Sequence, residues 1–341
     1  MNKKPRIVYL DIVRVVACLM VIIQHSPMPN LGDVNSVLLS ATSFLSYPCV
    51  PLFFMVSGAL LLPVENSSSG SFLFIRKRLS KILFPTLFWT FFYFLVRIVQ
   101  DKPIEWINIL SIPFSPQGHG ILWFMYVLVG LYLIAPIISH WLRQSSKKEL
   151  EFYLALWLIT LSFTHLNNVL QISEGYNNVL CYFGGYIGYF VLGYYLHKYN
   201  NLHGGGEFLF VIVLFVVPIL FYGSCKYMGM LLSFSAYLSL LTASMSISWF
   251  LGIKMFMHKY LLTNNAAQAI ENVSNLSFGI YLMHIYFLTE ISWRLCDYLQ
   301  LIGVLQIILT TMLTFTLSFL VSWGISKLPY SQFVIGYKQK K

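Results

Sequence analysis

The first hydrophobic segment of the chain, residues 7–28, is long enough to cross a membrane but carries charged and titratable side chains. About 22 mostly apolar residues, each rising about 1.5 Å along a helix, are enough to span a bilayer. Asp11, Arg14 and His25 lie inside this segment. An arginine near the centre of a bilayer costs about 2.5–3.5 kcal/mol, so we expect Arg14 to face protein or water rather than lipid.

Arg14 and His25 are predicted to share one face of this helix. Eleven residues correspond to about 1,100° of helical rotation, which is three turns plus about 20°, and to a separation of about 16 Å along the axis. Asp11 precedes Arg14 by three residues and falls on nearly the same stripe, where it is a possible partner for the guanidinium. The face therefore carries polar groups at two depths.

The composition predicts a polytopic membrane protein. Hydrophobic residues make up 57% of the 341-residue chain, charged residues only 10%, and the mean hydropathy is +0.71. These values exclude an ordinary soluble domain. The net charge of +10 would indicate nucleic-acid binding in a soluble protein. In a membrane protein it more often reflects basic cytoplasmic loops, so we expect no nucleic-acid partner.

Ten apolar segments and the distribution of basic residues predict the topology. If the N-terminus is cytoplasmic, 17 of the 22 Lys and Arg residues fall on the cytoplasmic side and four on the other, with Arg14 inside the membrane. This bias supports an all-α protein of about ten transmembrane helices with both termini cytoplasmic and no appended soluble domain. The predicted segments are 7–28, 44–63, 79–99, 121–139, 150–165, 180–197, 207–225, 230–252, 276–294 and 301–326.

Two further regions contain candidate binding residues. The run RKRLSKILFP, which contains Arg76 and Arg78, is either a topology signal or a site for a phosphate-bearing cytosolic ligand, and the two interpretations are compatible. His119 lies in a Gly-rich loop on the opposite side, and Trp123 follows it at the expected interface. A tryptophan there is typical of a membrane anchor, and a single loop histidine is more often solvated than functional.

The ninth segment carries a second polar stripe. Ser277, Tyr281 and His284 follow the spacing i, i+4 and i+7, which places them on one helical face. Ionisable residues inside a membrane are candidates for function. Glu290 and Arg294 lie on a different face at the spacing of a helix ion pair, and we interpret that pair as structural.

Six segments, taken in this order, resemble acyltransferase family 3. They are the R-x10-H pattern of Arg14 and His25, PLFFMVSG, RKRLSKILFP, ILWFMYVLVGLYLIAP, GYFVLGYYL and SFGIYLMH. The resemblance covers essentially the whole chain, which is similar to the compact members that acetylate enterobacterial common antigen or O-antigen. One position departs from the family, whose members commonly read His-Leu-Trp-Phe where this chain has Ile121, with His119 two residues earlier.

The resemblance implies a membrane O-acyltransferase, most often an O-acetyltransferase, of the bacterial cytoplasmic (inner) membrane. Its donor would be acyl-CoA, usually acetyl-CoA, and its acceptor a hydroxyl of a surface or lipid-linked glycan, with no bound cofactor and no metal. Arg14, with Arg76 and Arg78, would contact the donor, and His25 would act as general base on the acceptor. Ser277, Tyr281, His284, Trp123 and His119 would contribute to substrate binding.

Other interpretations stay open from the residues alone. An ion-coupled transporter or flippase also places Arg and His on an internal helix face, although we detect no repeat of two similar halves. A sensor or scaffold explains the hydrophobic segments but not the polar stripe of residues 7–28. For an acyltransferase, direct transfer and a covalent acyl-enzyme are both compatible with the sequence.

Overall fold

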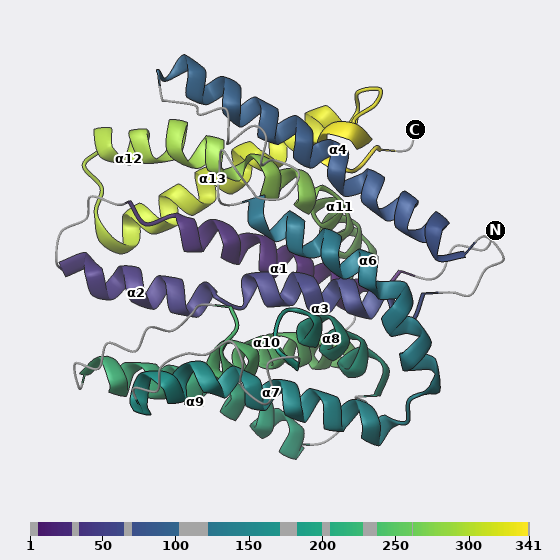
Figure 1. Cartoon of the computed structure of the whole chain (residues 1–341). Helices are drawn as coiled ribbons and strands as arrows, with labels where there is room; N and C mark the ends of the chain where they lie inside the picture. The colour runs from purple at the N-terminus through teal and green to yellow at the C-terminus, as the bar shows by residue number, and fades with distance from the viewer. Residues whose placement is uncertain are drawn as a thin grey trace. The chain divides into compact units, whose positions relative to one another are not determined.

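The computed structural model describes residues 6–28, 34–64, 70–101, 122–170, 183–199, 205–227, 237–260 and 262–339, and within these ranges its regular structure is helical (Figure 1). Helix α11 continues through a π-helical turn, η3, directly into α12. The elements are α1 (Val8–His25), α2 (Val34–Ser46), α3 (Cys49–Leu61), α4 (Gly70–Val99), α6 (Trp123–Gln144), α7 (Lys147–Leu170), α8 (Ile187–Tyr199), α9 (Gly205–Tyr227), α10 (Leu240–Lys259), α11 (Asn264–Phe287), η3 (Leu288–Ser292), α12 (Trp293–Tyr298), α13 (Gly303–Ser326) and α14 (Gln332–Ile335).

Within the described residues, seven helical segments are long and apolar enough to cross a membrane. They overlap seven of the ten predicted segments, and the prediction of an all-α polytopic membrane protein is confirmed. They are Val8–His25, Leu38–Leu61, Phe72–Val99, Trp123–Gln144, Gly206–Tyr227, Leu240–Lys259 and Gly303–Ser326.

The other three predicted segments correspond to helices outside that set. Residues 150–165 lie within α7, residues 276–294 continue from α11 through η3 into α12, and residues 180–197 overlap α8. The 13 residues of α8 span only about 20 Å, which is less than the hydrocarbon core of about 30 Å. The predicted number of spans and the cytoplasmic placement of both termini stay predictions.

The chain divides into two compact units. The first consists of Met1–Gln24, Ser36–Leu62 and His140–Ser274, and the second of His25–Asn35, Pro63–Ser139 and Asn275–Lys341. Helices α1, α2, α6 and α11 supply residues to both.

In the first unit, α3 and α8 pack closely because glycines remove side chains from their contact. A Cβ atom on Gly58 of α3 would lie 1.8 Å from the Phe190 carbonyl oxygen, and one on Gly193 of α8 would lie 2.0 Å from the Met55 carbonyl oxygen. Either contact is a collision with backbone. These small residues therefore serve helix packing, as is common in membrane proteins.

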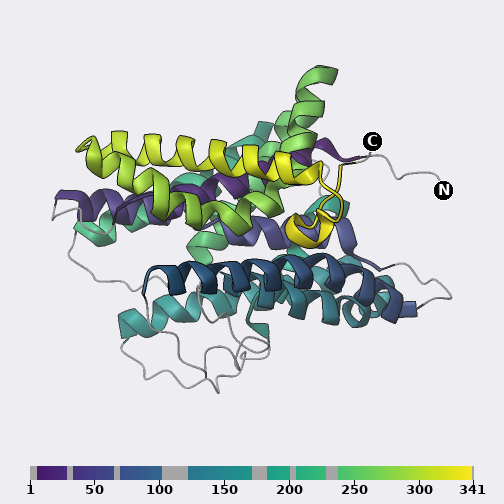
Figure 2. The same ribbon diagram turned by 90° about the horizontal axis from the view of Figure 1, so that it is seen from above.

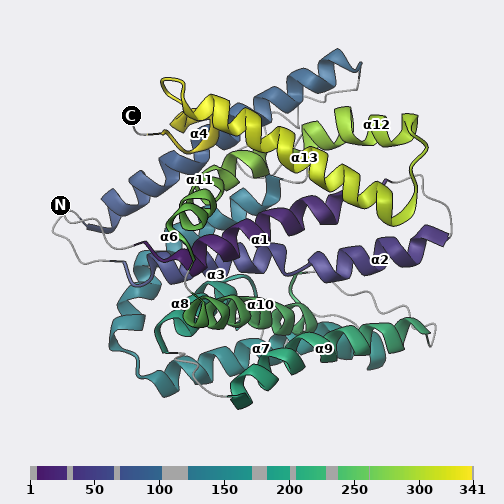
Figure 3. The ribbon, with the colours of Figure 1, turned by 180° about the vertical axis from the view of Figure 1, so that it is seen from behind.

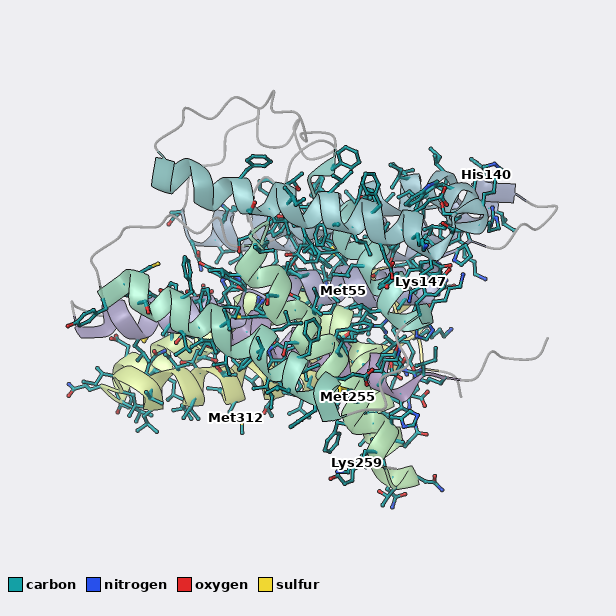
Figure 4. The ribbon with its side chains drawn as sticks, turned by 90° about the horizontal axis from the view of Figure 1, so that it is seen from below. Met55, His140, Lys147, Met255, Lys259 and Met312 are labelled. Atoms are coloured by element: carbon teal, nitrogen blue, oxygen red, sulfur yellow. The ribbon has the colours of Figure 1, made fainter. Side chains whose placement is uncertain are left out.

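Also in the first unit, α7 begins with a capping box. The Ser146 N–H donates to Oε2 of Glu149 at 2.6 Å, and the Glu149 N–H donates to the Ser146 hydroxyl at 3.3 Å. These bonds hold the pKa of Glu149 below its ordinary value, because they favour the charged carboxylate. His140 near the end of α6 and Lys147 at the start of α7 mark the two sides of this turn (Figure 4).

In the second unit, α4 is held by two hydrogen bonds that aromatic side chains donate to backbone carbonyls. Trp89 donates to the Val334 carbonyl in α14 at 3.0 Å, and Tyr93 donates to the Leu282 carbonyl in α11 at 2.8 Å. Figure 2 shows the short helix α14 against α4. Helix α4 begins at Gly70, so Arg76 and Arg78 lie inside the helix. Their backbone N–H groups are therefore used within the helix, and an anion could be bound there only by side chains.

Helix α13 in the second unit is polar on its buried side. Its outer side exposes large apolar residues such as Leu305, Ile308 and Met312. This arrangement is the reverse of a soluble protein and matches a helix that faces lipid. The buried polar residues recur at every fourth position: Gln306, Thr310, Thr314, Ser318, Ser322 and Ser326.

Candidate active site

Helix α1 carries both Arg14 and His25. Because α1 is continuous from Val8 to His25, their separation follows helix geometry: one face to within about 20°, and about 16 Å along the axis. Residues through Gln24 belong to the first unit, and His25 belongs to the second. The surroundings of each residue are therefore described within its own unit.

In the first unit, Arg14 belongs to a charged cluster formed by the start of α1 and by α11. Its Nη1 donates to the hydroxyl of Ser274 at 3.4 Å, and that hydroxyl donates to Oδ1 of Asp11 at 2.6 Å. Arg6 also binds Asp11 through two hydrogen bonds, from Nε to Oδ2 at 2.6 Å and from Nη2 to Oδ1 at 2.9 Å. Glu271 lies 3.1 Å from Nη1 of Arg6.

The cluster explains how a carboxylate is tolerated in this helix. Asp11 is 7% exposed and lies in the first turn of α1, where the helix dipole favours negative charge. The sequence predicts Arg14 as a possible partner of Asp11; in the structure Asp11 binds Arg6 and Ser274, which sequence reasoning missed. Ser274 joins Asp11 and Arg14 through one hydroxyl. The arrangement orients a guanidinium, a group that binds phosphate and carboxylate oxygens well.

In the second unit, His25 lies beside His284 of α11. The centroids of the two imidazole rings are 5.7 Å apart and the ring planes are tilted by 38°. His25 is partly exposed, whereas His284 is fully buried. Both Arg14 and His25 therefore contact α11, each within its own unit.

The hydrogen bond of His284 defines which of its ring nitrogens carries a proton. Its Nδ1 lies 2.5 Å from the backbone carbonyl oxygen of Tyr281. A carbonyl oxygen only accepts, so Nδ1 must be the donor, and in the neutral ring Nε2 is the acceptor nitrogen. The Tyr281 ring lies 5.5 Å from the His284 ring and 5.5 Å from that of Phe124. These contacts fix the orientation of His284.

The residue after His25 is held by hydrogen bonds from two helices. The Ser26 carbonyl accepts from Trp293 Nε1 of α12 and from Gln306 Nε2 of α13, each at 2.9 Å. The Ser26 hydroxyl lies 2.7 Å from that of Thr311. Ser26 and Gln306 are fully buried. The end of α1 that carries His25 is thus tied to the polar side of α13.

Comparison with known proteins identifies the family. A family model described as an acyltransferase domain matches residues 7–323, which include the whole of α1 and α11 and most of α13. The chain belongs to acyltransferase family 3. Comparisons with curated proteins and with solved structures gave no match. The apolar helices and the family together make the protein a multi-pass membrane acyltransferase.

The remaining residues predicted for this acyltransferase fall into different environments. Ser277 and Tyr281 are buried in the second unit on the face of His284, as the helical spacing predicts. Trp123 begins α6 and precedes Phe124, which contacts Tyr281. Arg76 and Arg78 are on α4 in the second unit, whereas Arg14 is in the first, so a shared donor site stays a prediction.

His119 and Ile121 lie outside the described residues, and the role predicted for His119 stays a prediction. The predicted pair of Glu290 and Arg294 is confirmed as an ion pair, and Glu290 also accepts from Gln100 at 2.9 Å. Within the described part of the chain, no group of three or more His, Cys, Asp or Glu side chains is arranged to hold a metal ion.

Sequence reasoning missed Arg6, Ser26, Ser274, Trp293 and Gln306. For Gln306 a signal exists in the sequence, because polar residues recur every fourth position from 306 to 326. For Ser274 the signal is its spacing of three residues before Ser277. Arg6 lies just before the helix and only five residues from Asp11, outside the helical spacing that was used, and Trp293 acts through a contact with Ser26 that only the folded chain creates.

Proposed function

We propose that this acyltransferase moves an acetyl group from acetyl-CoA to a hydroxyl of a surface or lipid-linked polysaccharide. The proposed location is the bacterial cytoplasmic membrane. The observation that supports the proposal best is the imidazole pair of His25 and His284, with rings 5.7 Å apart, at the end of the helix that carries Arg14. A base at one end and a guanidinium at the other suit an alcohol acceptor and a phosphate-bearing donor.

In the proposed reaction His25 is the general base. It takes the proton from the acceptor hydroxyl as that oxygen attacks the thioester carbonyl carbon. A new C–O bond forms, the C–S bond of the thioester breaks, and the leaving thiolate takes the proton back from His25. Each proton and electron pair is balanced in this sequence without a further reactant. An imidazole suits this exchange because it gains and loses a proton near physiological pH.

His284 acts in this scheme as a positioning residue. Its ring is fixed by the bond from Nδ1 to the Tyr281 carbonyl, so it offers a constant surface to the His25 ring. Small displacements of reacting groups are costly, since about 1 Å can lower a rate about 100-fold. A rigid neighbour therefore contributes to catalysis by keeping the His25 imidazole in its reactive position.

Arg14 acts on the donor in this scheme. Its guanidinium, oriented by Ser274, would bind the phosphate-bearing part of acetyl-CoA from the side on which most basic residues are predicted. The extended arm between the phosphates and the thioester would follow α1 toward His25, over about 16 Å. This path would bring a cytosolic acyl group to an acceptor at the opposite end of the helix.

The deciding experiment measures acetyl transfer in membranes. Vesicles that contain the protein are supplied with radiolabelled acetyl-CoA, and label is counted in the extracted glycan. We expect His25→Ala to lower the rate by about 10²–10⁴-fold, the usual contribution of a general base. His140→Ala is the matched control, because His140 is an exposed histidine near the end of α6.

The protein level in the membrane is measured for each variant by immunoblot. The control should keep its rate to within about twofold, equivalent to about 0.4 kcal/mol. A His25→Ala variant that accumulates normally and still transfers acetyl groups would remove His25 from the mechanism. If no label entered glycan even with the wild-type protein, the proposal that the acceptor is a polysaccharide would be overturned.

A further inference from the structure

The first unit contains an apolar cavity of about 520 Å³ that the proposed reaction does not use. It is bounded by α1, α9, α10 and the start of α11, and contact between α9 and α10 can be followed in Figure 3. Ile12 and Val15 form its α1 side, and Ile270 its α11 side. Its volume falls within the range of ligand pockets, which is about 300–1,000 Å³.

The lining of the cavity presents almost only carbon. Ser248 is one of its two residues with a polar side-chain group, and its hydroxyl donates to the Val211 carbonyl at 2.7 Å. Trp249 is the other, and its indole nitrogen is buried without a hydrogen-bond partner among the described residues. A polar or charged group inside the cavity would lose its bonds to water without replacement. The cavity therefore suits a hydrocarbon chain.

The cavity opens toward the lipid phase. Ile212 and Phe256 line it and are at the same time 40% and 56% exposed. Both lie on candidate membrane-spanning helices, so we expect their exposed sides to face hydrocarbon. An empty cavity would lose dispersion contacts on its whole lining, whereas a lipid chain from the bilayer restores them.

The end of α10 supplies positive charge next to the cavity. Phe256 and Met257 line the cavity, and Lys259 follows two residues later at the end of the helix. Figure 4 shows Lys259 at this end of α10. A lysine near the membrane surface attracts anionic lipid by about 1 kcal/mol. The charge complementarity favours a lipid with an anionic headgroup.

Gly252 of α10 leaves space in the cavity wall. A Cβ atom there would meet only the Cγ1 atom of Val211 within 4 Å, at an ordinary 3.6 Å. A glycine inside a helix costs about 0.5–1 kcal/mol relative to alanine. Unlike Gly58 and Gly193, Gly252 is not required by a backbone contact, so a larger side chain would enter the cavity rather than disrupt the helix packing.

We propose that this cavity binds one acyl chain of an anionic phospholipid, which enters laterally between α9 and α10. The site is independent of acyl transfer, because its occupant is a membrane lipid and not a donor or acceptor. It holds α1 beside α9 and α10 on the side of Ile12 and Val15. The bound chain completes the packing of the first unit.

The test is photo-crosslinking of the full-length protein in vesicles of phosphatidylethanolamine and phosphatidylglycerol. The probe is a phosphatidylglycerol with a diazirine in its acyl chain, and labelled peptides are mapped by mass spectrometry. We expect labelling to concentrate on the cavity residues of α9 and α10. Gly252→Leu should lower it about tenfold, equivalent to about 1.4 kcal/mol of lost binding.

Gly223→Leu is the matched control, because Gly223 of α9 is exposed and has no atom near its Cβ position. It should leave the labelling unchanged. Gly252→Ala adds one methyl group and should lower labelling by a smaller amount, which keeps the test decisive if leucine prevents folding. The proposal would be overturned if labelling were uniform around the exposed face of α9. It would also be overturned if the two leucine variants were labelled equally.

Two further arms identify the occupant. A phosphatidylcholine probe should label the cavity less than phosphatidylglycerol, and equal labelling would contradict the anionic headgroup. Excess palmitoyl-CoA, in the absence of any acceptor, should not compete with the probe. Competition would assign the cavity to a long-chain acyl donor instead. No arm depends on turnover, so a failure of the proposed acetyl transfer is distinguishable from a failure of this site.

Discussion

The two ends of α1 differ in how they accommodate polar side chains. At the Arg14 end, charges are balanced by opposite charges: Arg6 pairs with Asp11 and Glu271, and the Ser274 hydroxyl joins Asp11 to Arg14. At the His25 end, the described contacts are those of uncharged groups: an imidazole ring, hydroxyls and an amide. A charged end suits the binding of an anion, and an uncharged end suits a group that must gain and lose a proton.

The largest effect is expected at the uncharged end. His284→Ala removes the ring beside His25, and we expect acetyl transfer to fall about 100-fold because the general base loses its fixed neighbour. The measurement is the rate of label transfer at equal protein level in the membrane. His284→Gln, which retains volume and polarity, is measured beside it to separate a packing defect from loss of the ring.

Tyr281→Phe provides the control for this prediction. His284 is bound by the Tyr281 backbone carbonyl, which the substitution retains, so the rate should change by less than about threefold, equivalent to about 0.6 kcal/mol. If Tyr281→Phe were as inactive as His284→Ala, the tyrosine hydroxyl rather than the imidazole would be the important group.

A smaller effect is expected at the charged end. Arg14→Lys retains the positive charge but loses the planar guanidinium that donates to Ser274. We expect KM for acetyl-CoA to rise about tenfold, as for the loss of about 1.4 kcal/mol of binding, with a smaller change in kcat. Steady-state rates at varied acetyl-CoA test this. An unchanged KM with a reduced kcat would move Arg14 from donor binding to the reaction itself.

The smallest effect concerns stability at the same end. Asp11→Asn keeps a hydrogen-bonding group but removes the charge that Arg6 binds, and we expect the free energy of unfolding to fall by about 1–3 kcal/mol. The loss should be below that of a fully buried pair, because the Arg6 side chain is 37% exposed. Thermal unfolding in detergent measures the change.

Glu271→Gln is the matched substitution for Asp11→Asn. Both carboxylates bind Arg6, but Glu271 is 36% exposed in its side chain, so its loss should cost only about 0–1 kcal/mol. Equal losses for the two variants would contradict the view that burial makes Asp11 the main anchor of this cluster.

The sequence predicted the fold class and part of the candidate site. Composition and hydropathy identified a helical membrane protein because such signals are averages over many residues. The shared face of Ser277, Tyr281 and His284 was predicted because helical spacing is local. The contact of His25 with His284 was not, since it joins residues far apart in the chain and depends on how α1 and α11 pack.

Other features could not be found by periodicity. The predicted segment 44–63 is interrupted between α2 and α3, and the turn at Tyr47 and Pro48 has little effect on an average of hydropathy. The π-helical turn η3 begins four residues after His284 in the same segment, and no pattern in that segment distinguishes it from a regular helix. Hydropathy indicates whether a segment lies in lipid or in water, but it does not indicate the hydrogen-bonding pattern of its backbone.

The polar side of α13 restricts how this helix can turn. A rotation by one residue, about 100°, would move its row of hydroxyl and amide groups out of the protein and toward lipid. Thr314 and Ser322, which bond to Ser292 and Met283 inside the protein, would then lose those partners, and the lipid phase supplies no water to replace them. Because Gln306 belongs to this row and binds the Ser26 carbonyl, the rotational setting of α13 also affects the position of His25, the residue before Ser26. A single-residue insertion in α13 would therefore shift His25 relative to His284 without altering any residue of α1.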